Sequence, residues 1–573
     1  NLTGVLQLPM ERVSRAEGLL STVRETLHTV SGRDKDRLLF GDQDLVAEKL
    51  GYADADALMS EVAQAARAVD YLMEMAWYRY RHKGKDGVGR FIKKVRSTRV
   101  GQGISVSNRE VVIDETYDFD LDPVIGLRAA ATAAQLGLRL NFDSLRIYAD
   151  ALDQGKGKLS TPWPREAREY LISLIGAGPA MIEIFEALDQ EEVLFHWIPE
   201  WREVRSLPQR NVLHRHTVDR HMVETAVAAA ALTREVHRPD LLLFTALFHD
   251  IGKGTQEDHS LRGERLIEPL AERIGFNAGD IQIIQSLIRH HLLLSATATR
   301  RDLDDPATIA SVVEAITDVK RLELLHALSI ADGEATGRAA WTDWKASLVA
   351  DLVRRTKLAL TDNTVAAQPE LTSPQIQKAE RGLLSVEIVD RGSVYAIEII
   401  VPDKTGLLSI VSGVLNILRL DVRSARTRTL NTVAVMEWIV VPDPHAPELT
   451  AEILHKEISK GLEGEEKLAE RIQNRIEAYS SLPSIPVPPP IVETFHDAAT
   501  DATIIEVRSH DRPALLFSIG DAVRQCNIDI KSAIVTTLGA EAIDTLYVTE
   551  IGGGVLTPER AHEVASRLAA SLK

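Results

Sequence analysis

The sequence His249-Asp250-Ile251-Gly252-Lys253 stands directly after residues 241–248, an uncharged and mostly apolar run. Such a run predicts a buried helix that presents an imidazole and a carboxylate at its end, and Gly252 predicts where that helix stops. Adjacent imidazole and carboxylate groups suit a borderline or hard divalent cation, but two ligands are too few to hold one. A metal site here therefore needs further ligands from other parts of the chain.

The chain offers more His and Asp residues on both sides of this sequence. His221 opens an amphipathic helical pattern, and downstream lie His259, the pair His290-His291 and Asp332. A mixed shell of such side chains around Mg²⁺, Mn²⁺ or an iron ion would polarise a phosphoryl oxygen and lower the pKa of a bound water. This predicts hydrolysis of a phosphate ester. Isolated histidines are more often plain surface or core residues, and we expect this of His214, His216, His237 and His326.

The order His, then His-Asp, then Asp on successive predicted helices resembles the HD phosphohydrolase superfamily over about residues 205–361. The resemblance implies an all-α domain that performs hydrolysis with a bound metal. It implies that the metal is held by four side chains, those of His221, His249, Asp250 and Asp332.

The same resemblance covers a second metal position and two catalytic residues. Some HD proteins hold a second ion with a His-x-x-x-Gly turn and a later His, which here match His259 with Gly263, and His291. Whether the site holds one ion or two therefore remains open. Asp250 is expected to act in catalysis as well as in metal binding. Lys253 is expected to steady a phosphate oxygen, and a solvated loop lysine is the alternative.

Composition shifts along the chain predict several domains, as the length of 573 residues also does. Long amphipathic patterns without strand alternation predict an all-α helical front, and strand-like alternation appears only near the C-terminal end. The expected boundaries are a helical front at 1–204, the HD domain at 205–361, a linker at 362–393, a strand-rich unit at 394–478, a proline-rich linker at 479–502 and a second strand-rich unit at 503–573.

The two strand-rich units are an internal repeat at a fixed offset of 108 residues. Residues 403–408, Asp-Lys-Thr-Gly-Leu-Leu, recur at 511–516 as Asp-Arg-Pro-Ala-Leu-Leu. Residues 420–425 likewise recur at 528–533, so one supersecondary unit is present twice.

Each repeat resembles the ACT domain, an α+β fold with the element order βαββαβ. The resemblance implies that a small amino acid binds at the turn between the first strand and helix, where Gly406 permits close approach to the backbone. The second copy has Ala514 in place of this glycine, which puts its ligand binding in doubt. Packing or dimerisation without a ligand is the alternative for both copies. The ligand-binding residues implied by the resemblance are Asp403, Gly406, Leu407 and Asp511.

Charge, cysteine content and hydropathy restrict partners and location. The chain has 66 Lys and Arg against 83 Asp and Glu, a net charge of −17, which disfavours nucleic acid and anionic lipid as partners. The one cysteine, Cys526, excludes an internal disulfide framework and fits a reducing compartment. No uncharged apolar run is long enough to cross a bilayer. We therefore expect a cytoplasmic protein without a membrane or nucleic-acid partner.

An HD domain followed by tandem ACT domains resembles the bifunctional uridylyltransferase and uridylyl-removing enzymes, the GlnD family. Residues 38–43 and 197–201 also resemble segments of that family. The resemblance implies that a metal-bound hydroxide removes a uridylyl or adenylyl group from a PII nitrogen-signalling protein, and that glutamine regulates this reaction at the ACT domains.

The front of the chain departs from that family. A nucleotidyltransferase core needs a glycine-rich turn followed by an Asp-x-Asp pair, and no such motif is found, because 118–122 has the carboxylate spacing without the glycine turn. We interpret 118–122 as an acidic loop. Transferase activity is therefore expected only in a longer chain, of which the sequence starting at Asn1 would be a fragment.

Two alternative functions remain. A guanosine tetraphosphate hydrolase also combines HD and ACT domains, but its HD domain usually lies near the N-terminus and one ACT domain follows. A pure amino-acid sensor with a degenerate HD domain would lack metal ligands, whereas none of the expected ligands is missing here.

Overall fold

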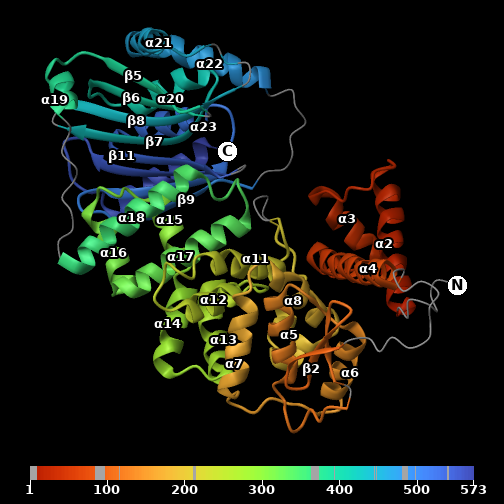
Figure 1. The fold of residues 1–573 in the computed structure, drawn as a ribbon. Helices are drawn as coiled ribbons and strands as arrows, with labels where there is room; N and C mark the ends of the chain where they lie inside the picture. The colour runs from red at the N-terminus through yellow and green to blue at the C-terminus, as the bar shows by residue number, and fades with distance from the viewer. Residues whose placement is uncertain are drawn as a thin grey trace. The chain divides into compact units, whose positions relative to one another are not determined.

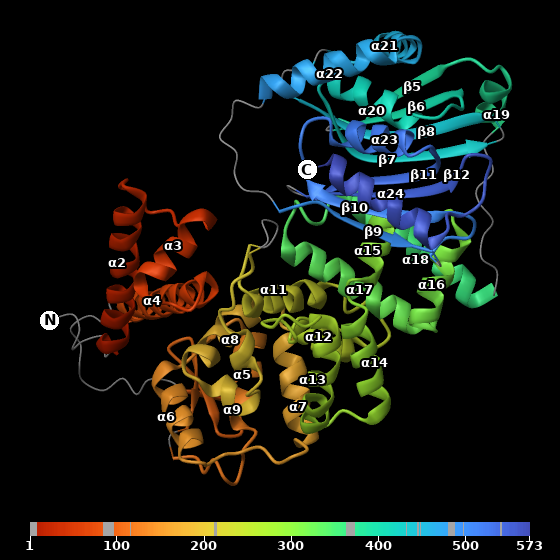
Figure 2. The ribbon, with the colours of Figure 1, turned by 180° about the vertical axis from the view of Figure 1, so that it is seen from behind.

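The computed structural model describes residues 9–83, 97–114, 116–210, 215–362, 373–392, 394–430, 432–443, 446, 448–479, 488–496, 498–538 and 541–572. The chain divides into two compact units, drawn in Figures 1 and 2. The first comprises Asn1–His291 and Lys320–Trp341, and the second comprises Leu292–Val319 and Thr342–Lys573. None of the described helices combines the length and apolar composition needed to cross a membrane.

The first unit is mainly helical and begins with three helices. Their shared core includes Val23, Leu27, Val46 and Leu58, which recur at helical spacing and are buried. The helices of this unit are α2 (Met10–Ser31), α3 (Phe40–Leu50), α4 (Ala55–Lys83), α5 (Ile125–Leu136), α6 (Phe142–Asp153), α7 (Arg165–Ile175), α8 (Ala180–Gln190), α9 (Val193–Trp197), α10 (Trp201–Val204), α11 (Val218–Ala231), α12 (Pro239–Phe248), α13 (His259–Ile274), α14 (Ala278–Arg289) and α17 (Val319–Thr336).

The prediction of an all-α front is wrong, because the first unit contains a small four-stranded sheet. Its strands, in sheet order, are β1 (Thr98–Gly101), β2 (Ile104–Ser107), β3 (Glu110–Ile113) and β4 (Arg139–Leu140). Asn108 and Arg109 both have positive φ, 51° and 65°, and form the two-residue turn that suits an antiparallel hairpin. Strands of two to four residues are too short for alternation to be distinguished from a helical pattern.

The acidic run 118–122 lies in a turn region, as interpreted from the sequence. Asp122 accepts hydrogen bonds from the buried guanidinium of Arg128 on α5, at 2.5 Å and 3.2 Å. This carboxylate therefore stabilises the packing of α5.

The predicted helical character of the HD region is confirmed. Every element between Val218 and Asp362 is a helix. The second unit includes three of these helices, α15 (Leu293–Arg300), α16 (Pro306–Ile316) and α18 (Asp343–Asp362).

The rest of the second unit contains the two repeats, each with a four-stranded antiparallel sheet. The sheet orders are β5-β6-β8-β7 and β9-β10-β12-β11, with the strands labelled in Figure 2. The elements are α19 (Ser373–Glu380), β5 (Ser385–Asp390), β6 (Tyr395–Pro402), α20 (Leu407–Ile417), β7 (Leu420–Leu430), β8 (Val433–Pro442), α21 (Ala451–Glu463), α22 (Glu465–Tyr479), β9 (Ile491–Phe495), β10 (Thr503–His510), α23 (Leu515–Gln525), β11 (Ile528–Leu538), β12 (Glu541–Glu550) and α24 (Pro558–Ser571).

The element order differs from the expected βαββαβ. In both repeats the edge strand precedes the others, so the order is ββαββα, and the first repeat has a further helix, α22, after α21. The edge strands β5 and β9 lie in stretches expected to be linkers, and residues 480–487 of the second of these lie outside the described residues. An edge strand has one unpaired side and is partly exposed, so its hydrophobic signal is weak.

The repeat relationship extends to the irregularities of the sheets. The pairing of β7 with β8 shifts between Val422 and Ser424, and that of β11 with β12 shifts between Ile530 and Ser532, at equivalent positions. β7 lies beside β11 and α20 beside α23, so the two repeats share one hydrophobic core.

Candidate metal centre

The His249-Asp250 pair is delivered by α12, as the sequence predicts. Pro239 occupies the first turn of this helix, and all eight residues 241–248 are buried. His249 follows as the C-terminal cap with ordinary right-handed backbone angles. The pair is therefore anchored by a helix without a solvent-facing side.

Gly252 permits a close approach of two backbone segments. A Cβ at this position would overlap the carbonyl oxygen of His259 and lie 2.5 Å from the amide nitrogen of Gly263. The left-handed residue of this turn is Gly254, with φ 101°, and not Gly252. The absence of a side chain at Gly252 therefore lets the start of α13 lie against the His-Asp turn.

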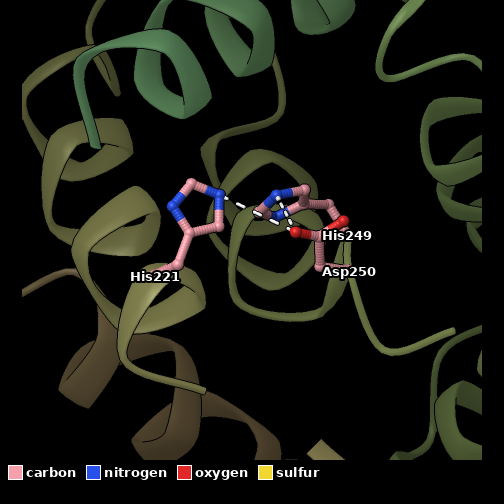
Figure 3. A group of neighbouring side chains, drawn as sticks. All are labelled: His221, His249 and Asp250. Atoms are coloured by element: carbon pink, nitrogen blue, oxygen red, sulfur yellow. Dashed lines mark ion pairs between the residues drawn. The ribbon is translucent and has the colours of Figure 1, made fainter. Parts of the chain in front are cut away.

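Three of the predicted metal ligands meet in one buried group, shown in Figure 3. His221 comes from α11, and its Nε2 is 3.8 Å from Oδ2 of Asp250. Nε2 of His249 is 3.5 Å from the same oxygen. All three side chains are nearly inaccessible to solvent. The two imidazoles thus face one carboxylate oxygen.

Asp332 on α17 joins this group. Its Oδ1 is 2.9 Å from Nε2 of His221 and 3.6 Å from Nε2 of His249. The structure therefore brings together all four side chains of the first predicted ligand set, from α11, α17 and the C-terminal end of α12.

The residues predicted for a second ion form another group around the same aspartate. Oδ1 of Asp250 is 3.7 Å from Nε2 of His259 and 3.6 Å from Nε2 of His291. The two Nε2 atoms are 3.4 Å apart. Asp250 therefore directs one oxygen to each group.

Two backbone contacts orient the imidazoles. Nδ1 of His249 lies 2.9 Å from the carbonyl oxygen of Ala246, and Nδ1 of His291 lies 2.7 Å from that of Ile288. A carbonyl can only accept, so Nδ1 carries the proton in both rings. In the neutral form of each ring, the lone pair is therefore on Nε2, which faces the centre as metal-binding histidines require.

Unpaired polar atoms at the centre fit a bound cation. Nε2 of His249 and Oδ1 of Asp250 are buried and have no hydrogen-bond partner among the described residues. Burial of such atoms is unfavourable unless they are satisfied. A divalent ion would satisfy both, and the nitrogen and oxygen donors suit Mg²⁺, Mn²⁺ or iron.

The charge states of the ligands are also suitable. Burial alone would raise the pKa of Asp250, but His249 and Lys253 outweigh it and hold that pKa well below its usual range. The pKa of Asp332 is lowered in the same way by His221 and His249 against the effect of burial. Burial lowers the pKa of His291 to about 4. At neutral pH the carboxylates are ionised and His291 is neutral.

Lys253 is held inside the centre and is not a solvated loop lysine. Its Nζ lies 2.6 Å from Oδ2 of Asp250 and donates to Oε1 of Gln209 at 2.7 Å. Arg262, on α13, donates to the carbonyl oxygens of Gly252 and Lys253 at 3.1 Å. Gln209 and Arg262 belong to no recognisable motif, so the sequence analysis did not identify them.

A second group of residues that the sequence did not reveal surrounds Arg67 on α4. Its guanidinium lies 2.6 Å from Oδ2 of Asp219, and it also pairs with Glu186 and Asp189 on α8. Asp219 is on the first turn of α11, two residues before His221. Arg67 therefore connects the N-terminal helices to the helix that carries a metal ligand.

The other histidines do not join either group. Neither potential metal group includes His216, His237 or His326, and His214 lies outside the described residues. His326 is partly buried on α17, and burial lowers its pKa.

The predicted ligand-binding residues of the repeats lie at two turns of the second unit. In the first copy, Asp403 opens the turn, Gly406 ends it with φ 92°, and Leu407 begins α20. Asp511 lies in the equivalent turn before α23, where Ala514 has φ 63°. Alanine thus adopts the left-handed conformation that glycine has in the first copy.

Comparison with known proteins covers most of the chain. The HD domain family matches residues 218–327, and the family described as GlnD PII-uridylyltransferase matches residues 7–77. A bifunctional uridylyltransferase/uridylyl-removing enzyme of Streptomyces coelicolor is 38% identical over 99% of this chain and 74% of its own length. Enzymes with the same description from Mycobacterium tuberculosis and Ruegeria pomeroyi are 37% and 27% identical, over 69% and 67% of their lengths.

Proposed function

The chain belongs to the family of bifunctional uridylyltransferase/uridylyl-removing enzymes, and we propose that its metal centre hydrolyses the bond between a nucleotidyl group and a PII signalling protein. The group removed is uridylyl or adenylyl, and the products are unmodified PII and a nucleoside monophosphate. The observation that carries the proposal is Asp250, whose two oxygens face two groups of histidines.

The residues of the centre have distinct roles in this reaction. His221, His249, Asp250 and Asp332 would hold one ion, and His259 and His291 would hold a second with Asp250. Mg²⁺, Mn²⁺ or iron bound there supplies polarisation of a phosphoryl oxygen and a lowered pKa for water.

Asp250 and Lys253 set the charge of the centre, in addition to the role of Asp250 in metal binding. Asp250 remains ionised because imidazoles and Lys253 surround it. Lys253, fixed by Asp250 and Gln209, places a cation beside the centre, where it can neutralise a phosphate oxygen of the substrate.

Regulation is assigned to the repeats. We propose that they are ACT domains and that glutamine, acting as an effector there, raises the rate of removal by favouring one of two conformations. The duplicated strand, turn and helix supports this role. The chain itself is proposed to act in the cytoplasm without nucleic acid or membrane, and to lack the transferase activity of its relatives.

One experiment distinguishes the candidate functions. The purified chain with Mn²⁺ is incubated separately with uridylylated PII, adenylylated PII and guanosine tetraphosphate, and the products are identified by mass. We expect release of UMP or AMP, loss of that release in Asp250→Asn, and its retention in Asp34→Asn, a matched change at an exposed aspartate.

Each other outcome contradicts the proposal in a defined way. Turnover of guanosine tetraphosphate alone would identify the chain as a hydrolase of that nucleotide. No turnover of any substrate would identify it as a sensor. Incorporation of nucleotide into PII from UTP or ATP would show that a transferase is present.

A further inference from the structure

The guanidinium of Arg67, on α4, uses all of its hydrogen-bonding capacity. Nε and Nη2 donate to the two oxygens of Glu186, at 3.1 Å and 2.7 Å, and Nη2 also donates to Oδ2 of Asp189 at 3.0 Å. Nη1 donates to Oδ2 of Asp219 at 2.6 Å and to Oγ of Ser206 at 3.0 Å. A guanidinium has five N–H donors in a fixed plane. Each donor of Arg67 is therefore matched by an acceptor, and the planar group fixes where those acceptors lie.

The two acceptors of Nη1 stand at the two ends of the connection between α10 and α11. Ser206 is completely buried and has φ 54°, in the left-handed region that residues other than glycine rarely adopt. Asp219 is buried in the first turn of α11. Between these two anchors the amide of Val218 donates to the carbonyl oxygen of Leu207 at 2.9 Å. One nitrogen of Arg67 thus fastens both ends of this connection.

Each end of the connection leads to a residue of the metal centre. Gln209 follows Ser206 closely in the chain, and its Oε1 accepts a hydrogen bond from Nζ of Lys253 at 2.7 Å. Asp219 precedes His221 in the same helical turn. The positions of the lysine and of the histidine therefore both depend on anchors that the same guanidinium holds.

Arg12 provides a matched arginine whose contacts end at α8. It lies on α2, and its guanidinium donates to Oε1 of Glu191 and to the carbonyl oxygen of Gln190, both at 2.9 Å. Glu191 is buried, as the carboxylates of Asp189 and Asp219 are. Both arginines attach an N-terminal helix to the region of α8, and the contacts of Arg67 extend further, to the first turn of α11. A role beyond packing is therefore expected for Arg67 and not for Arg12.

We propose that Arg67 is a positioning residue for hydrolysis at the metal centre. Through Asp219 it sets the position of His221, a proposed metal ligand. Through Ser206 and the residues that follow, it sets the position of Lys253. The inference rests on the proposed function of the centre. Arg67 lies in the segment that matches the GlnD PII-uridylyltransferase family and outside the match to the HD domain, so the HD domain depends on a residue that it does not itself contain.

The first test measures binding of Mn²⁺ to the full chain by electron paramagnetic resonance of the free ion, and needs no substrate. Partners of metal ligands typically contribute about 10 to 100-fold in metal affinity, and we expect a loss of about tenfold for one ion in Arg67→Met. Arg67→Lys keeps the charge without the planar fork, so it should recover part of the loss. Arg12→Met should bind Mn²⁺ as the wild type does. A thermal melt shows whether each variant is folded.

Two milder variants keep the test valid if Arg67→Met, which leaves the buried Asp219 without its counter-charge, does not fold. Asp219→Asn breaks the same contact and should lower the affinity of one Mn²⁺ ion by a similar factor. Ser206→Ala should leave the Mn²⁺ affinity unchanged and lower kcat for nucleotide release severalfold, because only the support of Lys253 is weakened. A purely structural role would not separate metal affinity from kcat in this way.

The opposite outcomes are equally defined. Wild-type Mn²⁺ affinity in Asp219→Asn and in folded Arg67→Met would overturn the proposal. An equal loss of affinity in Arg12→Met would also overturn it, because packing of the N-terminal helices would then explain the effect. A wild-type kcat in Ser206→Ala would overturn the link to Lys253. Failure of the wild type itself to bind Mn²⁺ would refute the proposed metal centre, and with it any positioning of its ligands.

Discussion

Two buried aspartates, one in each unit, have opposite electrostatic environments. Asp250 is 2% exposed and Asp544 is 1% exposed, and burial by itself would raise the pKa of each. At Asp250, His249 and Lys253 reverse the effect and bring the pKa well below its usual value, whereas at Asp544 the neighbouring Asp511 adds to it. Burial alone therefore does not decide whether the pKa of a carboxyl is raised or lowered, because the adjacent charges can reverse the shift.

The difference predicts two kinds of binding. Asp250 is a permanent anion between two groups of neutral or cationic side chains, and it can hold a metal ion at neutral pH. Asp544 is protonated in much of the free protein near neutral pH, and a positively charged ligand would favour its ionised form. The following predictions test this contrast, starting with the largest effect.

Removal of the shared anion should abolish the metal centre. In the double variant His249→Ala, Asp250→Asn, the first group loses an imidazole and both groups lose their common carboxylate. We therefore expect no bound metal and no hydrolysis of modified PII. Elemental analysis of the purified protein measures the metal. His326→Gln, a change at a histidine outside both groups, should retain full stoichiometry, and an unchanged metal content in the double variant would sink the assignment.

Removal of one histidine of the second group should have a smaller effect. In His259→Ala the set around His221 and His249 stays intact, so we expect the metal content to fall from two equivalents to one. Elemental analysis after dialysis with Mn²⁺ measures the change. A fall to zero would mean that the two groups bind a single ion together, and no fall would exclude His259 as a ligand.

Replacement of Lys253 should reduce the rate without removing the metal. In Lys253→Met the contact with Oδ2 of Asp250 is lost, and partners of metal ligands typically contribute about 10 to 100-fold in activity or metal affinity. We expect a drop of that size in the rate of nucleotide release at saturating Mn²⁺. Lys253→Arg should recover part of it, and a variant with the wild-type rate would show that this lysine has no role.

The smallest expected effect concerns the pH dependence of stability at Asp544. Its pKa is near 4 in the unfolded chain and about 8 in the folded chain, so the neutral form favours folding. This contribution is complete below about pH 4 and is lost as pH rises through 8. The melting temperature of the second unit should therefore fall between pH 6 and pH 9 by several degrees more in the wild type than in Asp544→Asn. Parallel curves in differential scanning calorimetry would contradict the assigned pKa.

Predictions from sequence succeeded for residues that carry their own chemistry on regular helices. Residue type and order predicted His221, His249, Asp250 and Asp332 as one group and His259 and His291 as another, and the structure brings all six side chains together, while their binding of a metal stays a prediction. Predictions failed for short or exposed strands. The sheet of the first unit and the edge strands β5 and β9 have few buried residues, so their periodicity is weak.

The sequence by itself determined the helical HD region, the residue types of the candidate metal ligands and the duplication of the C-terminal unit, because residue identity and periodicity are local properties of the chain. The tertiary structure alone decided that Asp250 lies between both groups, that Lys253 contacts it, and that the cavity beside residues 511–517 is larger than the cavity beside residues 403–408. Cavities and shared ligands depend on side chains from segments far apart in sequence, such as Arg524 over Gly406. Their distances are set when those segments pack together, and no local pattern encodes them.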